Sequence, residues 1–118
     1  MVRLTGSLTV TSSRKLVKTI SHDLKDHEVV VFDFSGANYI DDSAAMLFKQ
    51  LIEIAAEEHT PAIAMGLSGD VAETLEALDV LQQVPRERIV EDIDGARQVA
   101  RKLLGLETSP SPTLDTEV

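Results

Sequence analysis

The sequence predicts an α/β fold in which a four- or five-stranded, mostly parallel but mixed sheet is flanked by about four helices. Two observations support this fold class. Short apolar runs of strand length alternate along the chain with segments whose apolar residues recur at helical spacing. The run at 29–34 is almost continuously apolar, as is typical of a strand buried on both faces of a parallel sheet.

Length and composition predict one globular domain. The chain has 118 residues and no cysteine, which excludes disulfides and thiolate chemistry. Its net charge of −9 argues against binding to nucleic-acid phosphates, because such proteins need clustered lysine and arginine. No apolar run approaches the roughly 18 residues of a membrane-spanning helix. We expect the folded domain at 1–105 and a polar, proline-containing, disordered tail at 106–118.

The N-terminal segment predicts a strand followed by a helix. Residues 2–4 and 8–10 alternate apolar and polar side chains, and Gly6 between them indicates a bend. That bend would allow the first one or two strands to run antiparallel at one edge of the sheet. Ser12 or Ser13 is expected to cap the following helix. The apolar positions of this helix are Leu16, Val17, Ile20 and Leu24.

The stretch 29–48 organises the rest of the prediction, because it contains a buried strand, a turn and the start of a helix. Ser35 and Gly36 open the turn, since glycine tolerates positive φ. Asp33 is expected to accept N–H groups of that turn. A helix follows at about 42–58. Its buried stripe comprises Ala44, Leu47, Phe48, Leu51, Ile52 and Ala55.

The C-terminal half predicts two further strands and two further helices. A short apolar strand is expected at 62–65 and a very short edge strand at 89–90. Between them, Asp70 and Glu73 have the form of a capping box at the start of a helix. Asp92 is expected to cap the last helix. The inward positions of the helix after Asp70 are Val71, Leu75, Leu78 and Leu81.

Catalytic, metal and cofactor sites are not predicted. The histidines lie at helix ends or on polar faces without metal-ligand spacing: His22, His27 and His59. No glycine-rich nucleotide-binding loop of either standard kind occurs. Asp33, Asp41 and Asp42 suggest one alternative, a Mg²⁺ site beside a phosphorylated aspartate, because carboxylates at strand ends hold such ions. The chain lacks the lysine that such a receiver domain needs after a later strand. We therefore expect a protein without enzyme activity, metal or cofactor.

The candidate functional residues form a polar interaction loop: Asp41, Asp42, Ser43 and Ala44. Ser43 is the candidate phosphoacceptor, because a phosphate on the first turn of a helix meets free N–H groups and the positive end of the helix dipole. It would also add a charge of about −1.5 to −2 beside two aspartates, which suits a switch for a protein partner. The alternative is that Ser43 or Asp42 only caps the helix.

From Asp33 to Ala44 the sequence DFSGANYIDDSA resembles the signature of STAS domains, the module shared by sulfate-permease-family transporters and anti-sigma-factor antagonists. The family pattern is an apolar strand, then D-h-S-x-h-x-x-h-D-x-[ST]-[GA], then an amphipathic helix. The upstream GSLTVTSSRKL and the strands expected at 62–65 and 89–90 also fit. The resemblance therefore covers about residues 2–104.

This resemblance implies a four- or five-stranded fold and a non-enzymatic regulatory and protein-interaction module. In the antagonists the residue at the position of Ser43 is phosphorylated by an anti-sigma kinase, which weakens binding, and Asp41 matches the family's acid two residues before it. In the transporters the domain lies on the cytoplasmic side, after the last membrane span. Asp42 departs from the small residue often found there, and its permanent charge disfavours an added phosphate.

Three features favour the transporter branch. The chain begins directly at the strand before Gly6, Ala44 stands where antagonists usually carry glycine, and the segment 85–100 resembles the close of many bacterial transporter versions. We therefore expect the regulatory domain of a sulfate-permease-family anion transporter on the cytoplasmic side of the inner membrane. A free-standing cytoplasmic anti-sigma-factor antagonist is the alternative. The expected partner is the transmembrane domain of the same transporter or a cytoplasmic regulatory protein, while nucleotide binding and a homodimer stay open.

Overall fold

A computed structural model describes residues 2–105, so the disordered tail predicted at 106–118 lies outside the described residues. The elements follow one another as β1 (Val2–Leu8), α1 (Val10–Asp23), η1 (Leu24–Asp26), β2 (Val30–Ile40), α2 (Asp42–Glu57), β3 (Ala62–Met65), α3 (Gly69–Ala77), η2 (Arg86–Arg88), β4 (Ile89–Val90) and α4 (Ile93–Leu103). Strands therefore alternate with helices, as the sequence predicts.

The four strands within residues 2–105 form one sheet in the order β1-β2-β3-β4, and each neighbouring pair is parallel. The α/β class is confirmed, but the mixed sheet with antiparallel strands at one edge is wrong. The reason is α1, which carries the chain back along the sheet so that β2 starts at the same end as β1. Gly6, at φ +72°, coincides with a shift in register inside β1 and does not reverse the chain.

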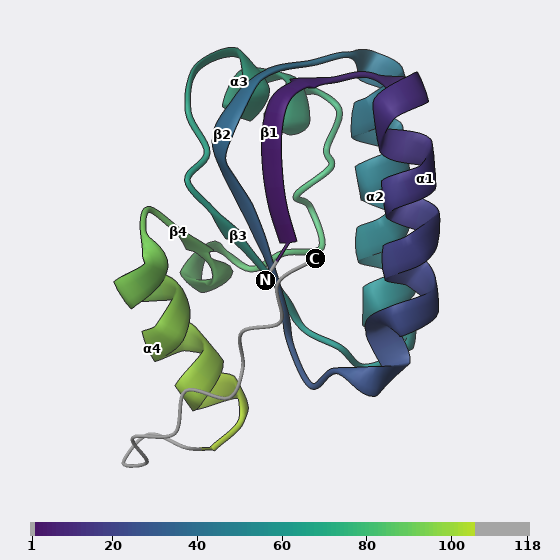
Figure 1. The fold of residues 1–118 in the computed structure, drawn as a ribbon. Helices are drawn as coiled ribbons and strands as arrows, with labels where there is room; N and C mark the ends of the chain where they lie inside the picture. The colour runs from purple at the N-terminus through teal and green to yellow at the C-terminus, as the bar shows by residue number, and fades with distance from the viewer. Residues whose placement is uncertain (1, 106–118) are drawn as a thin grey trace.

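The helices cover the two faces of the sheet unequally (Figure 1). α1 and α2 lie side by side on one face, and α4 lies on the other. The larger core cluster, on the face of α1 and α2, also includes Val71 and Leu75 from α3. A smaller cluster packs α4 onto the opposite face: Val29, Val31, Ile63, Met65, Ala96 and Ala100. The sheet is therefore the middle layer, and most of the core lies between it and α1, α2 and α3.

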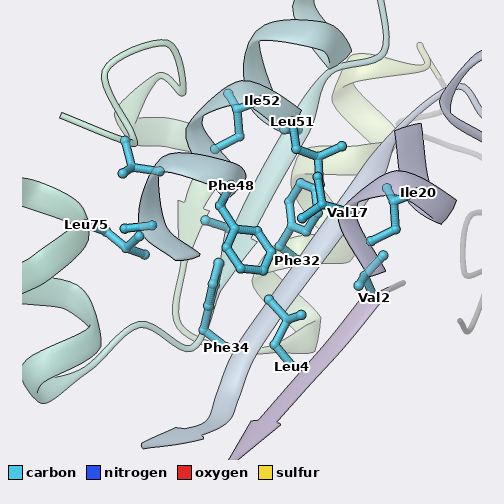
Figure 2. Packing of buried hydrophobic residues seen from close by; sticks show 14 of the residues in the cluster. Val2, Leu4, Val17, Ile20, Phe32, Phe34, Phe48, Leu51, Ile52 and Leu75 are labelled. Atoms are coloured by element: carbon cyan, nitrogen blue, oxygen red, sulfur yellow. The ribbon is translucent and has the colours of Figure 1, made fainter. Parts of the chain in front are cut away.

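Phe48 lies within the larger cluster and joins α2 to the sheet (Figure 2). Its ring centroid lies 6.4 Å from that of Phe32 and 5.9 Å from that of Phe34, both in edge-to-face geometry. The stripe expected on α2 is buried except for Leu47, which is half-buried. Helical periodicity therefore identified the face of α2 that packs on the sheet.

The turn predicted at Ser35 and Gly36 is wrong, because β2 continues through both residues to Ile40. Gly36 pairs with Thr5 of β1, and a Cβ at Gly36 would lie 2.8 Å from the Thr5 Cγ2 atom. This glycine allows two strands to approach closely. Asp33 Oδ1 accepts hydrogen bonds from the Ser35 N–H at 2.9 Å and from the Ser35 hydroxyl at 2.6 Å. The local aspartate–serine contact therefore forms within a strand.

The cap predicted for α1 is also wrong. Thr9 is the N-cap, and its Oγ1 accepts a hydrogen bond from the Ser12 N–H at 3.2 Å. Ser12 Oγ accepts the Thr9 N–H at 3.0 Å, so Ser12 completes a capping box, while Ser13 is buried. The apolar alternation through Val10 concealed this boundary, because Val10 is already helical.

The predicted caps of the last two helices have different outcomes. Ser68, whose backbone is extended, precedes α3, so Asp70 lies inside the first turn and the predicted capping box is wrong. α3 ends at Ala77, which leaves Leu81 outside the helix and half-buried. Asp92 caps α4 as expected, because its Oδ1 accepts the Gly95 N–H at 2.9 Å.

Candidate functional site

The candidate site lies where β2 ends and α2 begins. Ile40, the last residue of β2, is buried, and the Asp41 N–H donates a hydrogen bond to the Leu8 carbonyl at 3.0 Å. Because β1 and β2 are parallel, their carboxyl ends lie together at one edge of the sheet. The first turns of α1 and α2 therefore start beside each other.

The carboxylate of Asp41 links these two helix starts. Its Oδ1 accepts the Ala44 N–H at 2.6 Å, which makes Asp41 the N-cap of α2. Its Oδ2 accepts the Val10 N–H of α1 at 3.4 Å. The alternative in which Asp42 or Ser43 caps α2 is therefore wrong. A negative charge at two helix N-termini also interacts favourably with both helix dipoles.

The four residues of the predicted interaction loop divide into two kinds. Asp41 is half-buried and Ala44 is fully buried, so both belong to the packing of α2 against its neighbours. Asp42 and Ser43 are exposed on the first turn of α2. The structure therefore places a carboxylate and a hydroxyl on the surface, on a backbone that Asp41 holds in position.

Sequence reasoning missed two apolar residues beside this loop. Tyr39 and Met46 are 48% and 42% exposed, whereas most large apolar side chains in residues 2–105 are buried. Met46 lies one turn after Asp42 and Ser43, on the same side of α2. The position of Met46 opposite the apolar stripe of α2 was the sequence signal that could have predicted this exposure. We call Asp42, Ser43 and Met46 the Ser43 surface.

The Mg²⁺ site considered for Asp33, Asp41 and Asp42 is not assembled. Asp33 lies inside β2 and bonds to Ser35, while Asp41 bonds to the two helix starts. Within residues 2–105, no three or more His, Cys, Asp or Glu side chains are grouped so that they could hold a metal ion. The helices of residues 2–105 include none with the length and hydropathy of a membrane-spanning segment.

Replacing Asp41 tests its double role. Asp41→Ala is expected to lower the free energy of unfolding by about 2 kcal/mol, because it removes the cap of α2 and a hydrogen bond to α1. Asp92→Ala removes only a single cap and is expected to cost about 1 kcal/mol. Urea denaturation of the two variants measures the difference. Equal losses would show that the hydrogen bond to Val10 contributes nothing.

Comparisons with known sequences and with solved structures both find STAS domains. A protein-family model described as STAS domain matches residues 1–96. No curated protein sequence matches the chain significantly. The fold is similar to that of a sulfate transporter family protein from Wolinella succinogenes, with a TM-score of 0.77 and 16% identity over 88% of this chain and 86% of that chain.

Three further solved structures share the fold. The SulP transporter STAS domain from Vibrio cholerae has a TM-score of 0.74 and 11% identity over 88% of this chain and 81% of that chain. The anti-sigma factor antagonist SpoIIAA in its unphosphorylated form has a TM-score of 0.61 and 17% identity, over 86% of each chain. SLC26A9 has a TM-score of 0.66 and 11% identity over 92% of this chain, which spans only 21% of that protein. At such low sequence identities, the likeness to these four proteins shows a shared fold and nothing more.

Proposed function

Because this chain belongs to the STAS domain family, we propose that it is a regulatory and protein-interaction domain without catalytic activity of its own. The proposed domain occupies residues 1–105. The observation that carries the proposal is the exposed Ser43 hydroxyl on the first turn of α2, on a loop that the Asp41 carboxylate holds in place. A rigid, solvent-facing polar turn suits recognition by another protein.

The proposed partner is the transmembrane domain of a sulfate-permease-family anion transporter, on the cytoplasmic side of the membrane. Two of the similar structures are a sulfate transporter family protein and a SulP transporter STAS domain, which supports this branch. Ala44 is fully buried against the core. The exposed side chains of the Ser43 surface are the proposed docking residues.

The genomic reading frame tests the transporter branch. The proposal expects membrane-spanning segments to be encoded upstream of residue 1 in the same frame. A short frame that starts at residue 1 with its own ribosome-binding site would contradict the transporter branch.

Adding a charge at Ser43 tests the docking surface in the full-length transporter. Ser43→Glu is expected to lower the uptake of labelled sulfate about fivefold, the low end of typical coupling between sites. The reason is that a further negative charge beside Asp42 alters the docking surface, while a carboxylate near a helix N-terminus leaves α2 stable. Gln98→Glu adds the same charge at an exposed position of α4, on the other face of the sheet, and is the matched control. Equal uptake by both variants would reject the Ser43 surface.

The alternative function is a free-standing anti-sigma-factor antagonist, which the fold shared with SpoIIAA and the exposure of Ser43 support. This alternative makes Ser43 a phosphoacceptor. A neighbouring serine-kinase anti-sigma factor should then transfer phosphate from ATP to the chain. The control variant Ser12→Ala should still be labelled, whereas Ser43→Ala should not. Absence of labelling together with absence of binding would reject this alternative.

A further inference from the structure

A second surface lies beside α3, at the β4 edge of the sheet. It is a groove of about 660 Å³ between α3 and the segment 79–86, and its lining is mainly apolar. Five apolar residues of the lining are only half-buried: Leu67, Ala72, Leu81, Pro85 and Ile89. The end of α3 at Ala77 creates this arrangement, because Leu81 would otherwise continue the buried face of the helix. Apolar side chains therefore remain partly exposed along one side of α3.

Two carboxylates line the same groove at the C-terminal end of α3. Glu76 lies in the last turn and Asp79 follows the helix at φ +56°, and both are exposed. The last turn of α3 holds no basic residue. Negative charge at a helix C-terminus interacts unfavourably with the helix dipole. Arg86 from η2 is the one cation among the lining residues. A lysine or arginine supplied from outside would meet Glu76, Asp79 and the partial charge of the helix end.

We propose that this groove docks an amphipathic helix of a partner protein, with a basic flank. The apolar residues of that helix, at i, i+3 or i+4 and i+7, would cover the half-buried side chains of the groove. Its lysine or arginine side chains would face Glu76 and Asp79. Strand addition does not suit this edge, because β4 has only two residues. The proposal is independent of the Ser43 surface.

The test uses the full chain and two synthetic helical peptides. One peptide is an amphipathic helix of leucine and lysine, and the other carries glutamate in place of every lysine. Isothermal titration calorimetry is expected to show that the lysine peptide binds about tenfold more tightly. The double variant Glu76→Lys with Asp79→Lys is expected to reverse this order. Leu81→Gln is expected to weaken binding of the lysine peptide about fivefold.

The matched control is the double variant Glu53→Lys with Glu57→Lys. It changes the charge of the chain by the same amount at exposed positions of α2 that do not line the groove. It is expected to retain the preference for the lysine peptide. If this control lost the preference for the lysine peptide as fully as the Glu76 and Asp79 variant, the peptide would bind only through the net charge of −9. That result would overturn the proposal.

Three other outcomes would also overturn the proposal. A tenfold gain in peptide affinity on removal of 106–118 would identify the chain's own C-terminal segment as the occupant. Binding of the dye 1-anilinonaphthalene-8-sulfonate without binding of either peptide would indicate a site for small apolar molecules. If the double variant Glu76→Lys with Asp79→Lys does not fold, the neutral double variant Glu76→Gln with Asp79→Asn replaces it. Unchanged peptide preference in that neutral variant would reject the proposal.

Discussion

Phe48→Ala is expected to lower the free energy of unfolding by about 3 to 5 kcal/mol, the range for a large aromatic side chain lost from a core. Phe48 is 1% exposed and packs between α2 and the sheet. The substitution leaves a cavity that rigid neighbours fill only in part. It also removes the edge-to-face contacts with Phe32 and Phe34. Such aromatic contacts contribute free energy beyond that of the buried area.

Met46 provides the control for this variant. Met46 lies two residues before Phe48 on the same helix, but its side chain is 42% exposed. Met46→Ala is therefore expected to change the free energy of unfolding by no more than about 0.5 kcal/mol. Urea denaturation followed by circular dichroism measures both variants. A loss below about 1 kcal/mol for Phe48→Ala would contradict the packing described for α2.

Gly66→Ala is expected to lower the free energy of unfolding by about 3 kcal/mol, because it combines backbone strain with overpacking. Gly66 follows β3 at φ +74°, in the left-handed region that favours glycine. A Cβ at this position would lie 2.7 Å from the Ser35 Cβ and 2.9 Å from the Ser35 nitrogen. The Gly66 N–H also donates to the Val90 carbonyl at 3.1 Å, so the chain cannot move aside freely.

Gly6→Ala separates the two contributions in this prediction. Gly6 has nearly the same dihedral angle, φ +72°, but a Cβ there would meet no atom within 4 Å. Its substitution is therefore expected to cost only the strain of a left-handed alanine, about 1 kcal/mol. The difference between the two Tm values and denaturation midpoints reports the contact with Ser35. Equal losses in the two variants would show that the contact is relieved by small movements.

Features set by local pattern were predicted well. The buried stripe of α2 follows from apolar residues at helical spacing, and β3 follows from its short apolar run. Asp92 was recognised as a cap because an acid directly precedes a periodic segment. The position of the candidate site, between a buried strand and an amphipathic helix, was predictable for the same reason.

Features set by a neighbouring strand were not predictable. Gly36 is of a residue type that is common in turns, yet β1 pairs with this part of β2 and the strand extends to Ile40. Among Asp41, Asp42 and Ser43, the cap is the residue that follows the last strand pair. Asp41 takes that role because its N–H bonds to the end of β1.

Periodicity and composition alone therefore established the alternation of strands and helices, the buried face of α2 and the polar loop before it. These properties depend on residues a few positions apart, which interact whatever the rest of the chain does. The direction of β1, the length of β2, the exposure of Ser43 beside the capping Asp41 and the groove beside α3 depended on the assembled fold. Each of them arises from contacts between segments far apart in sequence, and such contacts leave no local pattern.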